Sequence, residues 1–134
     1  MNPSRLIIAA TFVGLSICVA ARLTNFGWNT VFYSVVVLPA LVLHFYFQYV
    51  GANMDWGRMM LAAIFSLISN FCLAASSIII PDGDDTDLIV AVFSTIENPP
   101  EDFYDIGFVL FGAGMFFSLL TFIIGFRSSR NKNT

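Results

Sequence analysis

The sequence predicts an all-α membrane protein, in which four transmembrane helices form an antiparallel bundle and one acidic exoplasmic loop joins the third helix to the fourth. The 134-residue chain is 57% hydrophobic and only 11% charged, whereas a soluble domain carries about 25% charged residues. Its mean hydropathy is +0.80. Four apolar runs approach or exceed the roughly 20 residues that a helix needs to cross a bilayer. We therefore expect a single membrane domain with spans at about 5–22, 28–50, 58–80 and 100–126.

The first span has an arginine at each end. Arg5 and Arg22 bracket an apolar run that is about 24 Å long as a helix, so both side chains have to reach toward a membrane surface. The segment also has the features of a secretory signal peptide, because Arg5 precedes an apolar core that ends in Val19-Ala20-Ala21. Cleavage would leave three spans. We expect the first helix to be retained.

The fourth span has the clearest start signal. Asn98 is a good N-cap, two prolines follow it, and Glu101 stands at the capping-box position. We therefore expect this helix to begin near Pro99. The preceding segment 88–96 has too few residues to span a membrane as a helix. It is expected at the membrane interface, as a short helix or an extended segment.

The distribution of charge predicts the orientation. With four spans, both termini and the second connection share one side, and that side holds every basic residue except Arg22. The positive-inside rule then makes both termini cytoplasmic and the loop 81–106 exoplasmic. This loop collects eight carboxylates between Asp82 and Asp105 and contains no Lys or Arg. Such a composition is expected of an exported segment.

The acidic loop also resembles a cation-binding loop in part. Counted from Asp82, position 5 of an EF-hand is Thr86 and position 12 is Phe93, where aspartate and glutamate are needed. We expect no metal site, and we interpret the loop as a surface for a protein partner or a weakly held cation. Arg22 is a candidate ion-pair partner for it. The carboxylates assigned to this surface are Asp82, Asp84, Asp85, Asp87, Glu101 and Asp102.

His44 is the single histidine and lies inside the second span, where an ionisable residue suggests a function. Counting from the inner helix ends places it about 9 Å deep. Thr11, Ser66 and Thr121 fall at the same level, and Gln48 lies one turn below His44 on the same face. The sequence thus predicts a polar intramembrane layer. The layer either joins the helices by hydrogen bonds or serves as a proton relay, a haem ligand or a quinone contact.

Contacts between helices are predicted from one amide and from small residues. Asn70 is expected near mid-membrane, where it would donate to the carbonyl of Val35 that Pro39 releases from its helix. Small residues recur every three or four positions in three of the spans and would let backbones approach closely in lipid. These stripes are Ala10, Gly14 and Cys18; Ala62, Ser66, Asn70 and Ala74; and Gly114, Ser118, Thr121 and Gly125.

The sequence lacks the motifs of known catalytic and nucleic-acid-binding proteins. Every Asp and Glu lies outside the apolar cores of the predicted spans, and there is no Ser-His-Asp set, zinc motif, phosphate-binding loop or basic patch. We expect a non-enzymatic membrane subunit without a cofactor. It would be a scaffold, stabiliser, regulator or immunity-type protein that docks on a larger membrane protein or on copies of itself. The alternatives are a small oligomeric transporter or channel with a pathway around His44, and a redox-complex subunit that contacts haem or quinone.

Overall fold

The computed structural model describes residues 3–24, 27–52, 56–83, 89–93 and 95–130. Over these residues each of four α-helices contains a stretch that is long and apolar enough to cross a membrane, which confirms the expected number of spanning helices. The described elements are, in order, α1 (Pro3–Thr24), α2 (Trp28–Ala52), α3 (Trp56–Ile79), β1 (Asp82–Gly83), β2 (Ile89–Ala91), β3 (Ile96–Glu97) and α4 (Asp102–Arg130).

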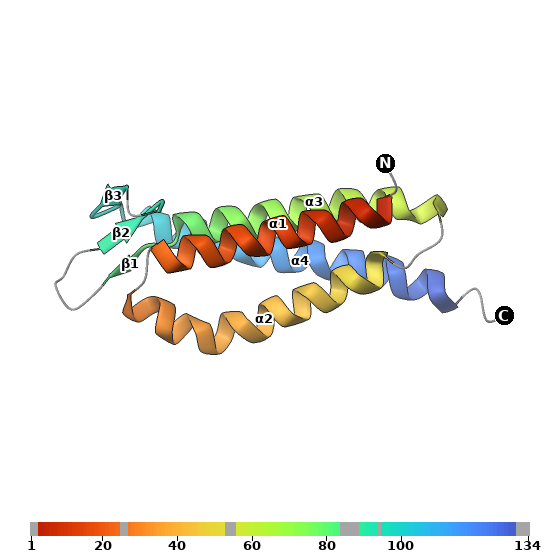
Figure 1. Cartoon of the computed structure of the whole chain (residues 1–134), viewed down its shortest axis with the longest axis horizontal. Helices are drawn as coiled ribbons and strands as arrows, with labels where there is room; N and C mark the ends of the chain where they lie inside the picture. Colours follow the sequence, from red (N-terminus) through yellow and green to blue (C-terminus); the bar gives the residue numbers. More distant parts are fainter. Residues whose placement is uncertain (1–2, 25–26, 53–55, 84–88, 94, 131–134) are drawn as a thin grey trace.

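The helices lie side by side along the long axis of the molecule (Figure 1). α1 and α3 end, and α2 and α4 begin, at the end that carries the strands, which we call the loop end. Both chain termini lie toward the opposite end, which we call the terminal end. α2 approaches α4 near the terminal end and stands apart from the other helices toward the loop end (Figure 1).

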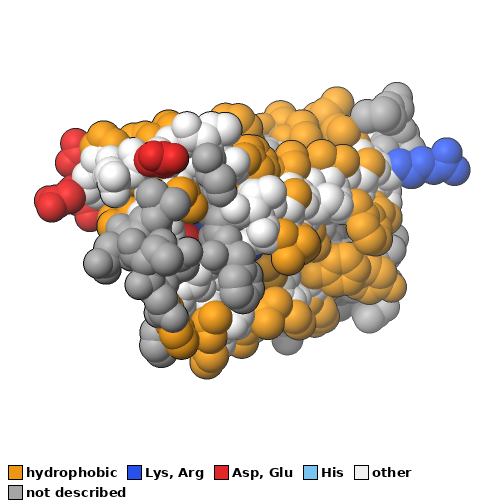
Figure 2. Space-filling view, turned by 60° about the vertical axis from the view of Figure 1, so that its left-hand side comes forward, with side chains coloured by type: hydrophobic (Ala, Val, Ile, Leu, Met, Phe, Trp, Pro, Cys, Tyr) orange, Lys and Arg blue, Asp and Glu red, His pale blue; other side chains and the backbone are white. Residues whose placement is uncertain are grey.

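Apolar side chains cover the outside of the helices. Val35, Phe71 and Val109 are 75%, 71% and 71% exposed. Figure 2 shows hydrophobic side chains along the visible flank, acidic side chains at the loop end and a basic side chain at the terminal end. Lipid tails are as apolar as these side chains, so a bilayer imposes no cost on their exposure. The surface therefore fits helices that face lipid.

The interior is built from small and polar residues. Every residue of the predicted small-residue stripes is buried except Ala10, which is half-buried. A Cβ atom at Gly14 of α1 would lie 2.7 Å from Oδ1 of Asn70 on α3, and one at Gly114 of α4 would lie 2.7 Å from Cγ of Leu73 on α3. The missing side chains thus let α1 and α4 approach α3 closely, as the stripes predicted.

Between α3 and α4 the described chain forms a small antiparallel sheet in the order β1-β2-β3. Asp82 pairs with Val90, which in turn pairs with Glu97. The Val92 N–H donates to the Ile78 carbonyl at 2.9 Å, which attaches the end of β2 to the last turn of α3. Segment 88–96 is expected to be either a short helix or an extended segment. It is extended over β2, which lies beside the helix ends.

α4 begins later than predicted. Asn98 has a φ of 48°, in the left-handed region, and the Phe103 N–H donates to the Pro100 carbonyl in a turn ahead of the regular helix. The helix begins at Asp102, so the predicted start near Pro99 is wrong. The physical reason is that Pro100 disfavours helical backbone angles in the residue before it.

We predict that Gly114→Ala destabilises the protein, whereas Gly112→Ala on the same helix does not. A Cβ at Gly114 meets the buried Leu73 side chain, but one at Gly112 meets nothing within 4 Å. Overpacking a close-packed interior costs about 1–3 kcal/mol, while alanine at an open helical position is neutral or slightly stabilising. Unfolding in a denaturing detergent, followed by circular dichroism, measures both variants. Equal losses would contradict the close approach of α4 to α3.

Candidate functional site

Buried polar side chains gather where α2 meets α3 and α4. His44 of α2 is fully buried, and its Nδ1 lies 2.9 Å from Oγ of Ser118 on α4. Its Nε2 lies 3.2 Å from Oδ1 of Asn70 on α3. Gln48, one turn along α2, donates from Nε2 to the same Ser118 hydroxyl at 3.2 Å. Together with Ser69 of α3, which lies 3.4 Å from His44 Nδ1, these residues form what we call the polar cluster.

The hydrogen bonds of the polar cluster define the direction of each donation. Asn70 donates from Nδ2 to the Ser66 carbonyl at 2.8 Å, so its Oδ1 faces His44 and accepts a proton held on Nε2. Nδ1 is then the acceptor for the Ser118 hydroxyl, which itself accepts from Gln48. A neutral imidazole therefore satisfies the chain of bonds, and every donation runs in one direction, from Gln48 through His44 to Asn70.

The Ser69 hydroxyl and the Gln48 amide oxygen take no part in this chain of donations. Ser69 uses its hydroxyl proton on the Gly114 carbonyl at 2.7 Å, so it does not donate to His44. Gln48 is buried, yet its Oε1 has no hydrogen-bond partner among the described residues. A buried acceptor without a partner costs free energy. Gln48 therefore contributes less to stability than its burial alone would suggest.

The predicted polar layer is displaced by about one helical turn. Thr11 and Thr121 are buried, but their hydroxyls donate within their own helices, to the carbonyls of Ile7 and Phe117. His44 faces serines and an asparagine one turn nearer the loop end. Thr11 and Thr121 therefore use their hydroxyl protons within their own helices and not on His44. α2 leans relative to α3 and α4 (Figure 1), so equal residue counts from the helix ends do not give equal heights.

Asn70 joins helices as predicted, but through other partners. Its side chain lies against Gly14 of α1 and bonds to His44 of α2. It donates within α3 and not to the carbonyl of Val35. The expected bond to Val35 is not formed, because the Asn70 amide nitrogen faces Ser66 of its own helix. The small-residue stripe identified Ser118 only as a packing residue, and no sequence signal distinguished Ser69.

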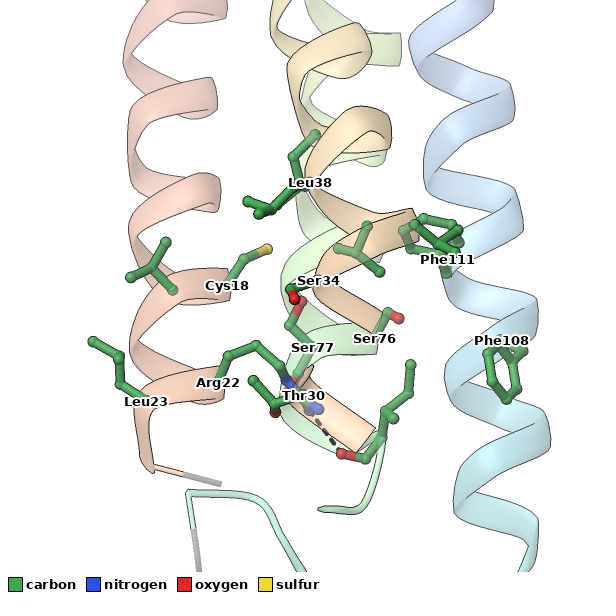
Figure 3. Close-up of a pocket in the computed structure, with 15 residues that line it drawn as sticks. Cys18, Arg22, Leu23, Thr30, Ser34, Leu38, Ser76, Ser77, Phe108 and Phe111 are labelled. Atoms are coloured by element: carbon green, nitrogen blue, oxygen red, sulfur yellow. Dashed lines mark hydrogen bonds between the residues drawn. The ribbon is translucent and has the colours of Figure 1, made fainter. Parts of the chain in front are cut away.

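At the loop end, Arg22 joins α1 to the end of α3. Its Nη2 donates to the carbonyl oxygens of Ser77 and, at 2.7 Å, of Ile80 (Figure 3). The last carbonyls of a helix lack intrahelical donors and carry the negative end of the helix dipole, so a guanidinium is favourable there. Nη1 lies 3.9 Å from Oδ2 of Asp82. In this structure the guanidinium of Arg22 thus lies within ion-pair distance of Asp82, the first carboxylate of the acidic loop.

Asp82 connects the same region to the start of α2. Its Oδ2 accepts the Thr30 N–H at 2.7 Å and also the Thr30 hydroxyl, while Oδ1 accepts the Gly83 N–H at 2.9 Å. The carboxylate thus caps the positive end of α2 from a distant part of the chain. Gly27 allows this approach, because a Cβ there would lie 2.6 Å from Oδ1. Asp82 is fully buried, so its predicted place on a partner or cation surface is wrong.

The other carboxylates assigned to the surface are not buried where the structure describes them. Glu101 and Asp102 are exposed at the start of α4. Asp84, Asp85 and Asp87 lie outside the described residues. In the described parts of the chain, no group of three His, Cys, Asp or Glu side chains is placed to hold a metal ion.

The polar cluster has some of the groups of a catalytic site. A serine hydroxyl beside an imidazole nitrogen, with the other nitrogen on an amide oxygen, resembles an activated nucleophile. Ser118 and His44 are, however, fully buried between helices that pack on one another. Comparisons with protein-family models, curated proteins and solved structures find no match. The geometry by itself is that of an interhelical connection.

We predict that Ser118→Ala destabilises the protein more than Thr121→Val. Both residues are fully buried on α4, but Ser118 bonds to two side chains of α2, whereas Thr121 bonds within its own helix. Losing interhelical hydrogen bonds in a membrane protein costs about 1–2 kcal/mol, and we expect the valine variant to lose much less. Detergent unfolding compares the two. A larger loss in Thr121→Val would rule out the polar cluster as the main attachment of α2.

We predict that Asp82→Asn destabilises the protein by about 3 kcal/mol, because it leaves Arg22 without its charged partner and weakens the cap on α2. Asp102→Asn is the matched control, since it removes the same charge from an exposed position. Thermal unfolding in a mild detergent measures both. Similar midpoints for the two variants would show that the buried carboxylate contributes no more than a surface charge.

Proposed function

We propose that the protein is a non-catalytic integral membrane subunit that docks on a larger membrane protein. In this proposal the helices cross the bilayer as an antiparallel bundle, with both termini cytoplasmic and the loop 81–106 exoplasmic. The loop end is the recognition surface. The orientation is supported by the positive-inside rule, because every basic residue except Arg22 belongs to a terminus or to the second connection of the sequence.

The observation that carries the proposal is the charge of the loop end. Four described carboxylates are exposed there, while the guanidinium of Arg22 is directed inward to backbone carbonyls and Asp82. The exposed surface at this end is therefore acidic (Figure 2). Opposite charge on a partner would steer association and fix its register. The exposed carboxylates are Glu97, Glu101, Asp102 and Asp105.

Apolar side chains lie among these carboxylates. Ile89 and Phe93 are each 38% exposed, and Ile106 is 48% exposed. Binding surfaces commonly combine an apolar centre with a charged rim. Ile89 lies in β2 and Phe93 just after it, and this segment is attached to α3 through the Val92–Ile78 backbone bond. The surface therefore rests on a fixed support, which lowers the entropy cost of binding.

The packing of the polar cluster supports this proposal over a transport pathway. The ring nitrogens of His44 both have hydrogen-bond partners, and those partners come from neighbouring helices of the same chain. A pathway residue would instead present its polar atoms to a permeating species. An accessory subunit needs only that its helices hold together, which this network provides.

We predict that neutralising the exposed loop-end carboxylates abolishes recovery of the partner. The variant replaces Glu97 and Glu101 by Gln and Asp102 and Asp105 by Asn, and it keeps the buried Asp82. Mild-detergent purification from the native cells, with mass spectrometry, should show partner recovery falling by about tenfold, the factor that corresponds to losing roughly 1.4 kcal/mol of binding. Arg5→Gln, at the other end of α1, is the control for a change of charge alone.

Unchanged recovery from the neutralised variant would refute the loop end as the docking surface. The orientation is tested in the same cells with a membrane-impermeant maleimide. Glu101→Cys should be labelled from outside and Arg5→Cys should not, because both positions are exposed but lie at opposite ends. The reverse pattern of labelling would overturn the proposed topology.

A further inference from the structure

An apolar crevice of about 360 Å³ lies between α2 and the other helices in the half of the molecule nearest the loop end (Figure 3). Cys18 and Arg22 of α1, Ser34 and Leu38 of α2, and Phe108 of α4 are among the residues that line it, and α3 forms its floor. The polar cluster lies outside this lining. The crevice is therefore a separate feature of the molecule.

The crevice exists because α2 is attached at two separated points. Near its start, Thr30 is bonded to Asp82, and toward the terminal end His44 and Gln48 are bonded to α3 and α4. Between these points the helix contains Pro39, which removes a backbone hydrogen bond and bends helices. α2 curves away from the other helices between its two attachments (Figure 1), and the crevice lies behind this part of the helix.

The walls of the crevice suit an apolar ligand. Most lining residues are aliphatic or aromatic, and three of the four hydroxyl groups among them, those of Thr30, Ser34 and Ser76, are already donating. Ser34 donates to the Val31 carbonyl at 2.6 Å, and Ser76 donates to the Gly107 carbonyl at 2.8 Å. The charge of Arg22 is balanced by Asp82. A free carboxylate or phosphate would therefore add an uncompensated negative charge beside Asp82, whereas a hydrocarbon chain would not.

The dimensions of the crevice match one leaflet of a bilayer. Its lining on α2 runs from Thr30 to Leu41, a distance of about 16 Å along a helix, and the hydrocarbon core of a bilayer is about 30 Å thick. Several lining residues are also exposed on the flank of the molecule, including Leu23, Val36 and Leu38 at 70%, 65% and 59%. The crevice therefore opens sideways, where lipid chains lie, and its volume is within the range of ligand sites.

We propose that the crevice binds one acyl chain of a bilayer phospholipid, which enters sideways from the leaflet at the loop end. The chain lies against α3 behind the bowed part of α2, and the headgroup stays at the membrane surface, outside the crevice. This site fills space that the fold leaves open next to hydrocarbon, where the lining would otherwise lose its dispersion contacts. The inference requires the helices to span a bilayer, but it is independent of any protein partner.

The test uses the full-length protein in phosphatidylcholine vesicles that contain a small fraction of phosphatidylcholine with a diazirine in one acyl chain. After illumination, mass spectrometry maps the labelled residues. Phe71 and Val109 report ordinary lipid contact, because they are exposed and do not line the crevice. We expect labelling of Cys18 and Leu41, which line the crevice and are not exposed, to saturate at a probe fraction that leaves Phe71 and Val109 unsaturated.

Two substitutions on α2 separate the crevice from the lipid-facing surface. Val37→Trp places a large ring in the crevice, whereas Val35→Trp places the same ring on the exposed face. We expect Val37→Trp to lower labelling of Cys18 relative to Phe71 by about tenfold, the factor expected when two methylene groups lose their burial. Val35→Trp should leave that ratio unchanged. Cys18→Phe, which fills the opposite wall, should lower labelling of Leu41 in the same way if Val37→Trp does not fold.

Equal labelling ratios in the two tryptophan variants, or labelling of Cys18 that follows Phe71 without saturating, would overturn the proposal. A second arm identifies the source of the chain with a diazirine-bearing fatty acid. If this acid labels the crevice and excess unlabelled phosphatidylcholine does not displace it, the crevice is a site for free fatty acid. That result would overturn the phospholipid assignment. Displacement by phosphatidylcholine would support it.

Discussion

The structure depends on a single constraint, which is that a polar group inside a membrane has to find its partner within the protein. α2 shows how this constraint determines packing. Its outer surface is apolar and gains nothing by leaving lipid, so apolar burial does not hold it against the other helices. Its attachment comes instead from hydrogen bonds at separated points, Thr30 to Asp82 near the loop end and His44 and Gln48 to Ser118 farther along.

The remaining helices associate by a different mechanism. α3 is contacted by α1 and α4 through positions without side chains, where Gly14 approaches Asn70 and Gly114 approaches Leu73. At these two glycines the space beside the backbone is taken up by a side chain of the facing helix, so the helices pack closely there. Polar attachment has the opposite result. It fixes α2 where its partners are and permits the segment between them, which contains Pro39, to bow away and leave the crevice.

This difference explains which features the sequence predicted. The spans and the small-residue stripes depend on local composition and periodicity. The structure accordingly contains four helices of the expected kind and buries nearly all of the stripe residues. The relative height of the helices depends on tilt, which residue counting does not contain, and the expected neighbours of His44 were therefore displaced by about one turn. The cap on α2 was also beyond local inference, because Asp82 and Thr30 are 52 positions apart.

The carboxylates of the acidic loop do not all have the same role, as Asp82 shows. Its carboxylate neutralises Arg22 and caps α2, so it belongs to the interior, whereas Glu101 and Asp102 remain exposed. The same residue lies at the junction of two surfaces. β1 and β2 extend from it into the acidic loop end, and Thr30 and Arg22, which it contacts, line the crevice. The support of the proposed recognition surface and the wall of the proposed lipid site are consequently one connected set of hydrogen bonds.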